Sequence, residues 1–126
     1  MRVRRIKEED CRKDFKTGYA PFDYDQYGNR LDSTYYWKRS QEGYEVYVIT
    51  DEVRVIALLC LQIRGDSIHF NRIGVYEGFH KIGYGTRMLI WGLDKMDELN
   101  IKIATARVRE DLIRVFKEVY GFKIIE

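Results

Sequence analysis

The spacing of apolar residues along the chain predicts most of its strands. Residues 44–50 alternate in character, residues 53–64 are mostly apolar, and Gly65-Asp66 supplies a turn before the next apolar stretch. Alternation with a period of two is typical of strands, and turn residues between such stretches favour hairpins. The predicted strands are residues 2–7, 44–50, 53–64, 68–75, 101–106 and 122–125.

Apolar residues also recur three or four positions apart, a spacing that predicts amphipathic helices. The clearest example opens at Gly83 and Gly85 and continues to Leu99, after which Asn100 can end the helix in the left-handed conformation. Near the N terminus, acidic residues precede basic ones, which complements a helix dipole. The predicted helices are residues 8–16, 33–41, 83–99 and 111–120.

A stretch without any periodicity lies between the first two helices. Residues 19–33 are rich in Tyr, Asp and Gly, which predicts a long loop. Loops of this length in compact domains often have a function, for example as lids. The order of the elements predicts one α/β domain over residues 1–126, built on a mixed sheet with helices on its faces.

Composition limits the classes of function. The chain of 126 residues is 45% hydrophobic and 33% charged with a net charge of +2, an ordinary balance for a globular domain. Basic and acidic residues are well mixed, so the charge favours neither nucleic acid nor a membrane surface as a partner. The N terminus has no apolar signal-peptide core, so we expect a cytoplasmic protein. Cys11 and Cys60 stand in no metal-ligand spacing, so we expect reduced, buried cysteines and no metal.

The segment His-Lys-Ile-Gly-Tyr-Gly-Thr at residues 80–86, here named the glycine loop, is the strongest chemical feature. It lies between a predicted strand and the start of a helix, where backbone N–H groups and the helix dipole favour anions. Glycines let an anion approach these amides closely, and Lys81 and Arg87 add positive charge. The spacing matches neither a dinucleotide-binding fingerprint nor a P-loop, so a simple tight turn is the alternative to a phosphate site.

Two motifs in the right order make the chain resemble the GNAT superfamily of N-acetyltransferases. The first is Val75-x4-His80-x2-Gly83-x-Gly85, which is similar to the superfamily's acetyl-CoA signature, and the second is the run VFKEVYGF at residues 115–122. The resemblance implies a GNAT-like fold with a central mixed sheet of six strands, about four helices and a truncated final strand. An open sheet edge invites pairing, so a homodimer that covers this edge is one expectation.

The same resemblance implies how the chain would bind acetyl-CoA. The strand end formed by Ile73, Gly74 and Val75 would pair its backbone with the pantetheine arm, and Phe116 would pack near the acetyl thioester. The other implied cofactor-binding residues are those of the glycine loop and one arginine, namely His80, Lys81, Ile82, Gly83, Tyr84, Gly85, Thr86 and Arg109.

Several positions depart from the family's pattern. His80 stands where the family has Arg or Gln, and Arg109 stands where many members have an Asn that bonds the pantetheine. Phe116 occupies the position of the tyrosine that is often proposed to protonate the leaving thiolate, and a phenyl ring cannot do this. Tyr120, one helical turn later, is a candidate catalytic substitute, and core packing is the alternative for it.

His69 is the candidate general base. An acceptor ammonium must lose a proton before its nitrogen reacts, and a histidine with an ordinary pKa of about 6.5 could accept that proton. By alternation we expect His69 to share a strand face with Asn71 and Ile73. In the histone-acetyltransferase branch a Glu occupies the matching strand position. A hydrogen-bonded strand histidine is the alternative, and Glu77 is a second candidate base.

In the family's fold, the early helices and loop line the acceptor pocket. This region of the chain is acidic and aromatic, and Tyr24, Asp25 and Tyr27 are the candidate substrate-binding residues. Such a surface suits a cationic amine through Coulomb attraction and cation–π contacts. A small amine, a lysine side chain and a peptide N terminus stay open as acceptors, and tyrosines that only anchor a loop are the alternative.

The sequence therefore predicts an acetyl-CoA-dependent N-acetyltransferase that acts on a primary amine. The substitutions at His80, Arg109 and Phe116 leave a second interpretation, a CoA-binding regulator with weak catalysis. A third interpretation is a small interaction protein or RNA-associated protein that uses the basic and tyrosine-rich surface.

Overall fold

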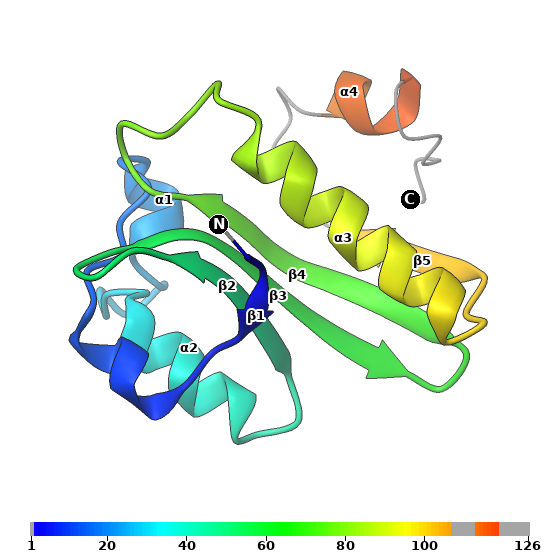
Figure 1. Ribbon diagram of the computed structural model, residues 1–126, viewed down its shortest axis with the longest axis horizontal. Helices are drawn as coiled ribbons and strands as arrows, with labels where there is room; N and C mark the ends of the chain where they lie inside the picture. Colours follow the sequence, from blue (N-terminus) through cyan, green and yellow to red (C-terminus); the bar gives the residue numbers. More distant parts are fainter. Residues whose placement is uncertain (1, 107–112, 119–126) are drawn as a thin grey trace.

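The computed structural model describes residues 2–106 and 113–118 and contains one mixed sheet. The strand order is β1-β2-β3-β4-β5, with antiparallel neighbours except for the parallel pair β4 and β5 (Figure 1). The elements are β1 Arg4–Arg5, the 3-10 helix η1 Glu8–Arg12, α1 Ala20–Asp23, α2 Ser33–Ser40, β2 Glu45–Thr50, β3 Val55–Arg64, β4 Ser67–Val75, α3 Tyr84–Glu98, β5 Ile103–Ala106 and α4 Ile113–Glu118.

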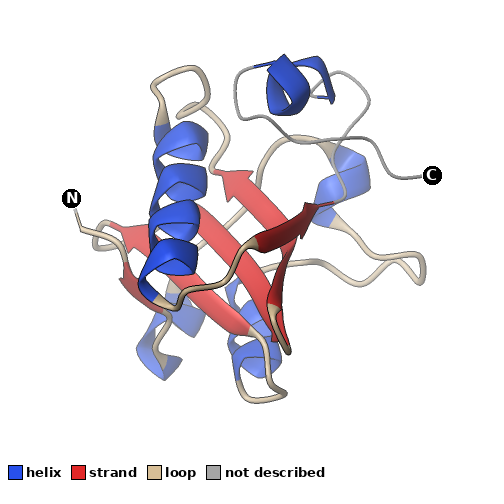
Figure 2. Ribbon diagram, turned by 90° about the vertical axis from the view of Figure 1, so that its right-hand side faces the viewer, coloured by secondary structure: helices blue, strands red, loops and turns tan. Residues whose placement is uncertain are grey.

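Both faces of the sheet are covered, and each has its own apolar core. Alternate residues of the central strand β3 point to opposite sides: Leu59 packs in the core under α3, and Leu58 packs in the core under α2. In Figures 1 and 2, α3 runs along one face of the sheet, while Figure 1 places α2 on the other. The mostly apolar run at residues 53–64 is therefore a strand buried between two layers.

Strand β4 has an extra residue at its middle. Leu61 of β3 pairs with Phe70, and the neighbouring Cys60 pairs with Arg72, so Asn71 has no partner on β3 and forms a β-bulge. On the other side of β4, pairing with β5 extends from Ser67 to Phe70 only. In the described part of the chain, the second half of β4 therefore leaves one edge of its backbone without a strand partner.

The N-terminal third differs from the sequence prediction. The predicted helix at residues 8–16 is only the short η1, because Lys13 is extended and the Asp10 side chain bonds back to the Lys7 amide. The predicted loop at residues 19–33 contains α1, with Pro21 in its first turn, where proline is tolerated. The predicted strand at residues 122–125 lies outside the described residues, so the counts of six strands and about four helices stay predictions.

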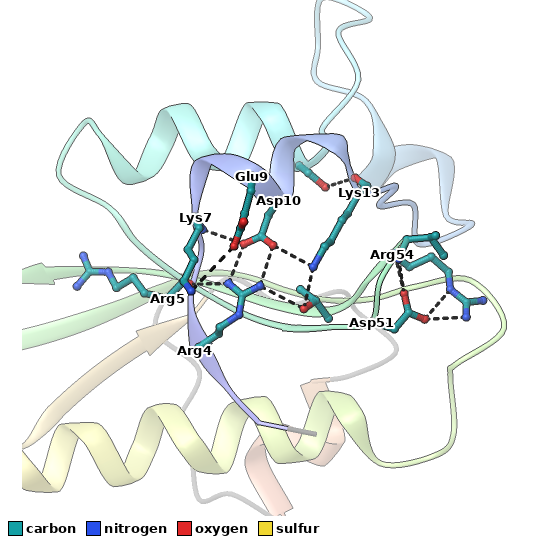
Figure 3. Close-up of polar contacts among 11 residues, drawn as sticks. Arg4, Arg5, Lys7, Glu9, Asp10, Lys13, Asp51 and Arg54 are labelled. Carbon is teal, nitrogen blue, oxygen red and sulfur yellow. Dashed lines mark hydrogen bonds and ion pairs between the residues drawn. The ribbon is translucent and has the colours of Figure 1, made fainter.

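A charged cluster joins β1, η1 and the end of β2 (Figure 3). Asp10 is fully buried and accepts two hydrogen bonds of 2.8 Å from the Arg4 guanidinium, while Lys13 Nζ lies 3.3 Å away. The Lys7 amide also donates to Asp10, at 2.8 Å. Burial alone would raise the pKa of Asp10, but the hydrogen bonds outweigh it, so the pKa lies below its usual range.

Replacing Asp10 should remove much of the stability of this corner. We expect Asp10→Asn to lower the free energy of unfolding in urea by about 2–4 kcal/mol, because it leaves the partly buried Arg4 and Lys13 without their counter-charge. Since the folded pKa of Asp10 is depressed, its contribution is complete above the unfolded pKa of about 3.9 and is lost as pH falls through the folded value. The wild type should therefore lose more stability than Asp10→Asn in that acidic range.

Glu9→Gln is the matched control, because Glu9 is exposed and lies 4.0 Å from Lys7 Nζ at the surface. We expect it to change stability by less than about 0.5 kcal/mol. Equal effects of the two variants would contradict the assignment of a structural role to Asp10.

Candidate active site

The segment that connects the end of β4 to α3, which includes the start of the glycine loop, contains a series of left-handed residues. Gly78 has φ +89°, Lys81 has φ +66° and Gly83 has φ +98°. Gly83 is the N-cap of α3 and has no side chain that could accept a hydrogen bond from the first turn. The first N–H groups of an α-helix have no acceptor within the helix, so this end of α3 is suited to an anion.

Aromatic side chains hold the start of this loop. The rings of Phe79 and Tyr84 lie 6.2 Å apart, and the Arg54 guanidinium lies 4.9 Å from the centre of the Phe79 ring. Tyr76 donates a 2.6 Å hydrogen bond to Asp14, which lowers the pKa of Asp14 and raises that of Tyr76. The loop is thus fixed to the N-terminal segment and to β3 before α3 begins.

A pocket of about 390 Å³ lies between the loop and the strand. It brings together most of the residues that the sequence predicted for cofactor binding. Its lining residues are Val75, Phe79, His80, Lys81, Gly83, Tyr84, Gly85 and Thr86.

The half of β4 that has no described partner on β5 runs from the bulge to this pocket, and its other edge pairs with β3. Ile73 packs on the α3 side, and Gly74 lies on the opposite face beneath Phe15. A Cβ at Gly74 would lie 2.8 Å from Phe15 Cζ, so only glycine fits here without a shift. The backbone edge of residues 71–75 and the pocket at Val75 form one continuous site.

His80 contacts the early segment of the chain. Its ring lies 5.2 Å from the ring of Tyr19, and the Glu77 amide donates a 2.8 Å hydrogen bond to the Lys16 carbonyl. The non-periodic N-terminal segment therefore lies beside the glycine loop. No sequence pattern predicts this contact, because the two rings are far apart along the chain.

The bulge corrects the expected orientation of His69. Ile68 and Phe70, which flank His69 in the strand, pack in the core under α3, so His69 points to the other face of the sheet. Ile73 packs in the core under α3, so His69 and Ile73 lie on opposite faces. Alternation fails because Asn71 adds one residue to the strand. His69 Nδ1 lies 2.7 Å from Thr105 Oγ1 on β5, at the last part of β4 that pairs with that strand.

The three predicted acceptor residues lie in and beside one tight turn. Asp25 accepts hydrogen bonds from the amides of Tyr27 and Asn29 at 2.9 and 2.8 Å, and these bonds hold the turn in place. The hydrogen bonds from Asn29 and Tyr27 lower the pKa of Asp25. Tyr24 and Tyr27 are 51% and 79% exposed. The two tyrosine side chains are therefore exposed to solvent, while the Asp25 carboxylate stabilises the turn.

The remaining predicted residues are divided between described and undescribed segments. Phe116 of α4 packs against the core under α3. Arg109 and Tyr120 lie outside the described residues. Burial raises the pKa of Cys60 to about 12, which keeps it protonated, as expected for a buried apolar residue, whereas Cys11 is only half-buried.

Residues 2–106 and 113–118 hold neither a candidate metal cluster nor a candidate membrane span. Within these ranges, no group of three or more His, Cys, Asp and Glu side chains could hold a metal ion. No helix in the same ranges is long and apolar enough to cross a membrane.

Sequence comparison decides the family. The model of the acetyltransferase (GNAT) family matches residues 6–122, which include β4, the glycine loop and α4. The chain belongs to the GNAT acetyltransferase family. No sequence among the curated proteins matches it.

Solved structures share the GNAT fold at low sequence identity. An acetyltransferase from Trypanosoma brucei has a TM-score of 0.73 and 12% identity, covering 99% of this chain and 94% of its own. The ribosomal-protein-S18-alanine N-acetyltransferase from Escherichia coli has a TM-score of 0.72 and 15% identity, covering 99% and 79%. At these identities the similarity establishes the fold alone.

The backbone of the GNAT glycine loop predicts opposite effects for its two glycines. We expect Gly83→Ala to lower the free energy of unfolding by about 1 kcal/mol, because Gly83 has φ +98°. Gly85 has ordinary helical geometry, and a Cβ there would meet Val75 Cγ2 at a comfortable 3.7 Å. Gly85→Ala should therefore leave stability unchanged or raise it slightly in the same urea titration. Equal losses in both variants would contradict this assignment.

Proposed function

We propose that the protein transfers an acetyl group from acetyl-CoA to a primary amine. The observation that supports this most is the open backbone edge of β4, which leads directly to the pocket at the N terminus of α3. An extended pantetheine arm needs backbone partners, and a pyrophosphate needs helix-terminal amides and positive charge. In this chain the backbone edge of residues 71–75 would pair with the pantetheine arm, and the adjacent first turn of α3 would bind the pyrophosphate.

The described residues fit such a cofactor. Ile73, Gly74 and Val75 would bind the pantetheine through their backbone, and the amides of residues 82–86 would bind the pyrophosphate. Lys81 is exposed at the pocket rim and would add positive charge. Gly85 leaves space beside Val75, since its nearest non-local neighbour would lie 3.7 Å from a Cβ. Acetyl-CoA, when bound, supplies the acetyl group as a thioester.

The chain itself would supply proton transfer and polarisation. His69 faces away from α3, toward the side of the sheet that α1 and α2 cover, and lies next to Phe70, the last β4 residue with a described partner on β5. From there it would accept the proton of the acceptor ammonium. Backbone N–H groups at the end of β4 would polarise the acetyl carbonyl. A small amine, a lysine side chain and a peptide N terminus are the acceptor classes.

Phe116 favours a second candidate function, CoA binding with little catalysis. Its ring packs against the core under α3 and cannot donate a proton to a thiolate. Such a protein would bind acetyl-CoA but would not transfer its acetyl group to an amine. Kinetics over a panel of amines separates the two functions.

Acetyl-CoA binding is the first test. We expect calorimetric titration to give a micromolar Kd and a raised melting temperature. Gly85→Val should weaken binding by about tenfold or more, which is about 1.4 kcal/mol, because its methyl groups fill the pocket beside Val75. Gly85→Ala is the matched control and should lose less. No binding at millimolar acetyl-CoA, or unchanged affinity in Gly85→Val, would contradict the cofactor assignment.

The proposed base predicts a selective kinetic defect. His69→Ala should lower kcat at pH 7 by about 100-fold or more and leave the Kd for acetyl-CoA within twofold, because His69 would act on the acceptor only. Thr105→Val removes the hydrogen-bond partner of His69 Nδ1 and controls for sheet stability. Full activity in His69→Ala excludes His69 as the base.

A further inference from the structure

Arg72 lies at the start of the open edge of β4, directly after the bulge. Its register partner is Cys60, which belongs to the core under α2, so its side chain points to the face that α1 and α2 cover. The guanidinium carbon lies 5.2 Å from the centre of the Phe22 ring in α1. A Cβ built on Gly74 would lie 3.3 Å from Arg72 Nε, so the guanidinium extends over this glycine.

Two nitrogen atoms of Arg72, Nε and Nη2, are buried and have no hydrogen-bond partner in the described part of the chain. The carboxylate of α1 is already engaged, because Asp23 accepts hydrogen bonds from the amide and hydroxyl of Thr17, at 2.8 and 2.9 Å, and from the Gly18 amide. Buried donors of a charged group are costly when they lack an acceptor. Their position therefore indicates where an anion would bind.

The geometry of a guanidinium decides which anion fits. Nε–H and Nη2–H lie on one edge and are parallel, so they match the two oxygens of a carboxylate. Phe15 and Phe22 lie near the guanidinium, and the contacts of Arg72 within the described residues include no second basic side chain. A single guanidinium balances the one charge of a carboxylate but not the nearly double charge of a phosphate monoester.

We propose that Arg72 binds a carboxylate of the acceptor, so that the acceptor is an amino carboxylate with its amine a few bonds from that group. The inference rests on the proposed function, because the acetyl donor would bind the backbone of the strand that holds Arg72. A diamine would leave Nε and Nη2 without an acceptor. Amino acids therefore rank above polyamines as acceptors.

The first experiment tests the site without turnover. The ¹H–¹⁵N signal of the Arg72 Nε–H group is assigned by its loss in Arg72→Lys and is then followed in the wild type. We expect it to shift on titration with sodium acetate and with L-lysine, and to stay in place with cadaverine or with sodium chloride at equal ionic strength. No shift with the carboxylates, or an equal shift with sodium chloride, overturns the proposal.

The second experiment compares acceptors that differ only by a carboxylate. The pairs are L-lysine with cadaverine, L-tyrosine with tyramine, and L-serine with ethanolamine; phosphoethanolamine tests a phosphate instead. Arg72→Gln should lower kcat/KM about 10- to 100-fold for the amino acids and less than about threefold for the decarboxylated amines, because only the former lose a charge-assisted bidentate contact. Arg72→Lys should restore part of the loss, and acetyl-CoA affinity should stay unchanged in both variants.

The outcomes separate the two proposals. Equal losses for both members of each pair would assign Arg72 a structural role, and a preference for phosphoethanolamine over serine would assign it a phosphate; either overturns the inference. A protein that binds acetyl-CoA and acetylates cadaverine as fast as lysine contradicts the carboxylate site alone. A protein whose Arg72 signal shifts with carboxylates but that does not bind acetyl-CoA contradicts the proposed function alone.

Discussion

In the described part of the chain, the backbone pairing of β4 with β5 extends only to Phe70, and the rest of the site depends on the edge of β4 beyond this pair. The bulge at Asn71 follows immediately, so the strand changes its twist and side-chain direction at the point where its edge becomes open. The open edge then leads to the left-handed glycine loop and the first turn of α3. A strand that stayed paired to its end would leave no backbone groups for an extended ligand beside that helix terminus.

Close packing fixes α3 at this point of separation. A Cβ at Gly92 would lie only 2.6 Å from Phe70 Cε1 and 3.2 Å from Leu59 Cδ2. The helix backbone therefore packs directly on Phe70, the last β4 residue with a described partner on β5. Glycine in a helix interior is unfavourable by roughly 0.5–1 kcal/mol relative to alanine, and here it allows an approach that alanine would prevent. The first turn of α3 is thereby held at a set position relative to the open edge.

The periodicity of the sequence predicted the main strands and the helix after the glycine loop, but the bulge that one extra residue makes in β4 was missed. The strands at 44–50, 53–64 and 68–75 and the helix after the glycine loop agree with the structure. A pocket lies at Gly83 and Gly85, where the sequence predicted a phosphate site, and the phosphate site itself stays a prediction. The bulge was missed although the sequence marks it: apolar residues stand at 68 and 70 and then at 73 and 75, so the alternation shifts by one position at Asn71 and Arg72. The orientation of His69 was wrong for that reason, and the contact of Tyr19 with His80 depends on tertiary packing that no local pattern reports.

Asp10 and the buried nitrogen atoms of Arg72 differ in how they are paired. Asp10 receives hydrogen bonds from Arg4 and from the Lys7 amide, so its desolvation is compensated within the chain. Arg72 keeps two buried donors without an acceptor, although it could have been replaced by an apolar residue that would pack against Phe22 at no electrostatic cost. The contact of the guanidinium with the Phe22 ring does not satisfy these two donors. The position of Arg72, at the open edge and on the side of α1, indicates that its partner is a ligand.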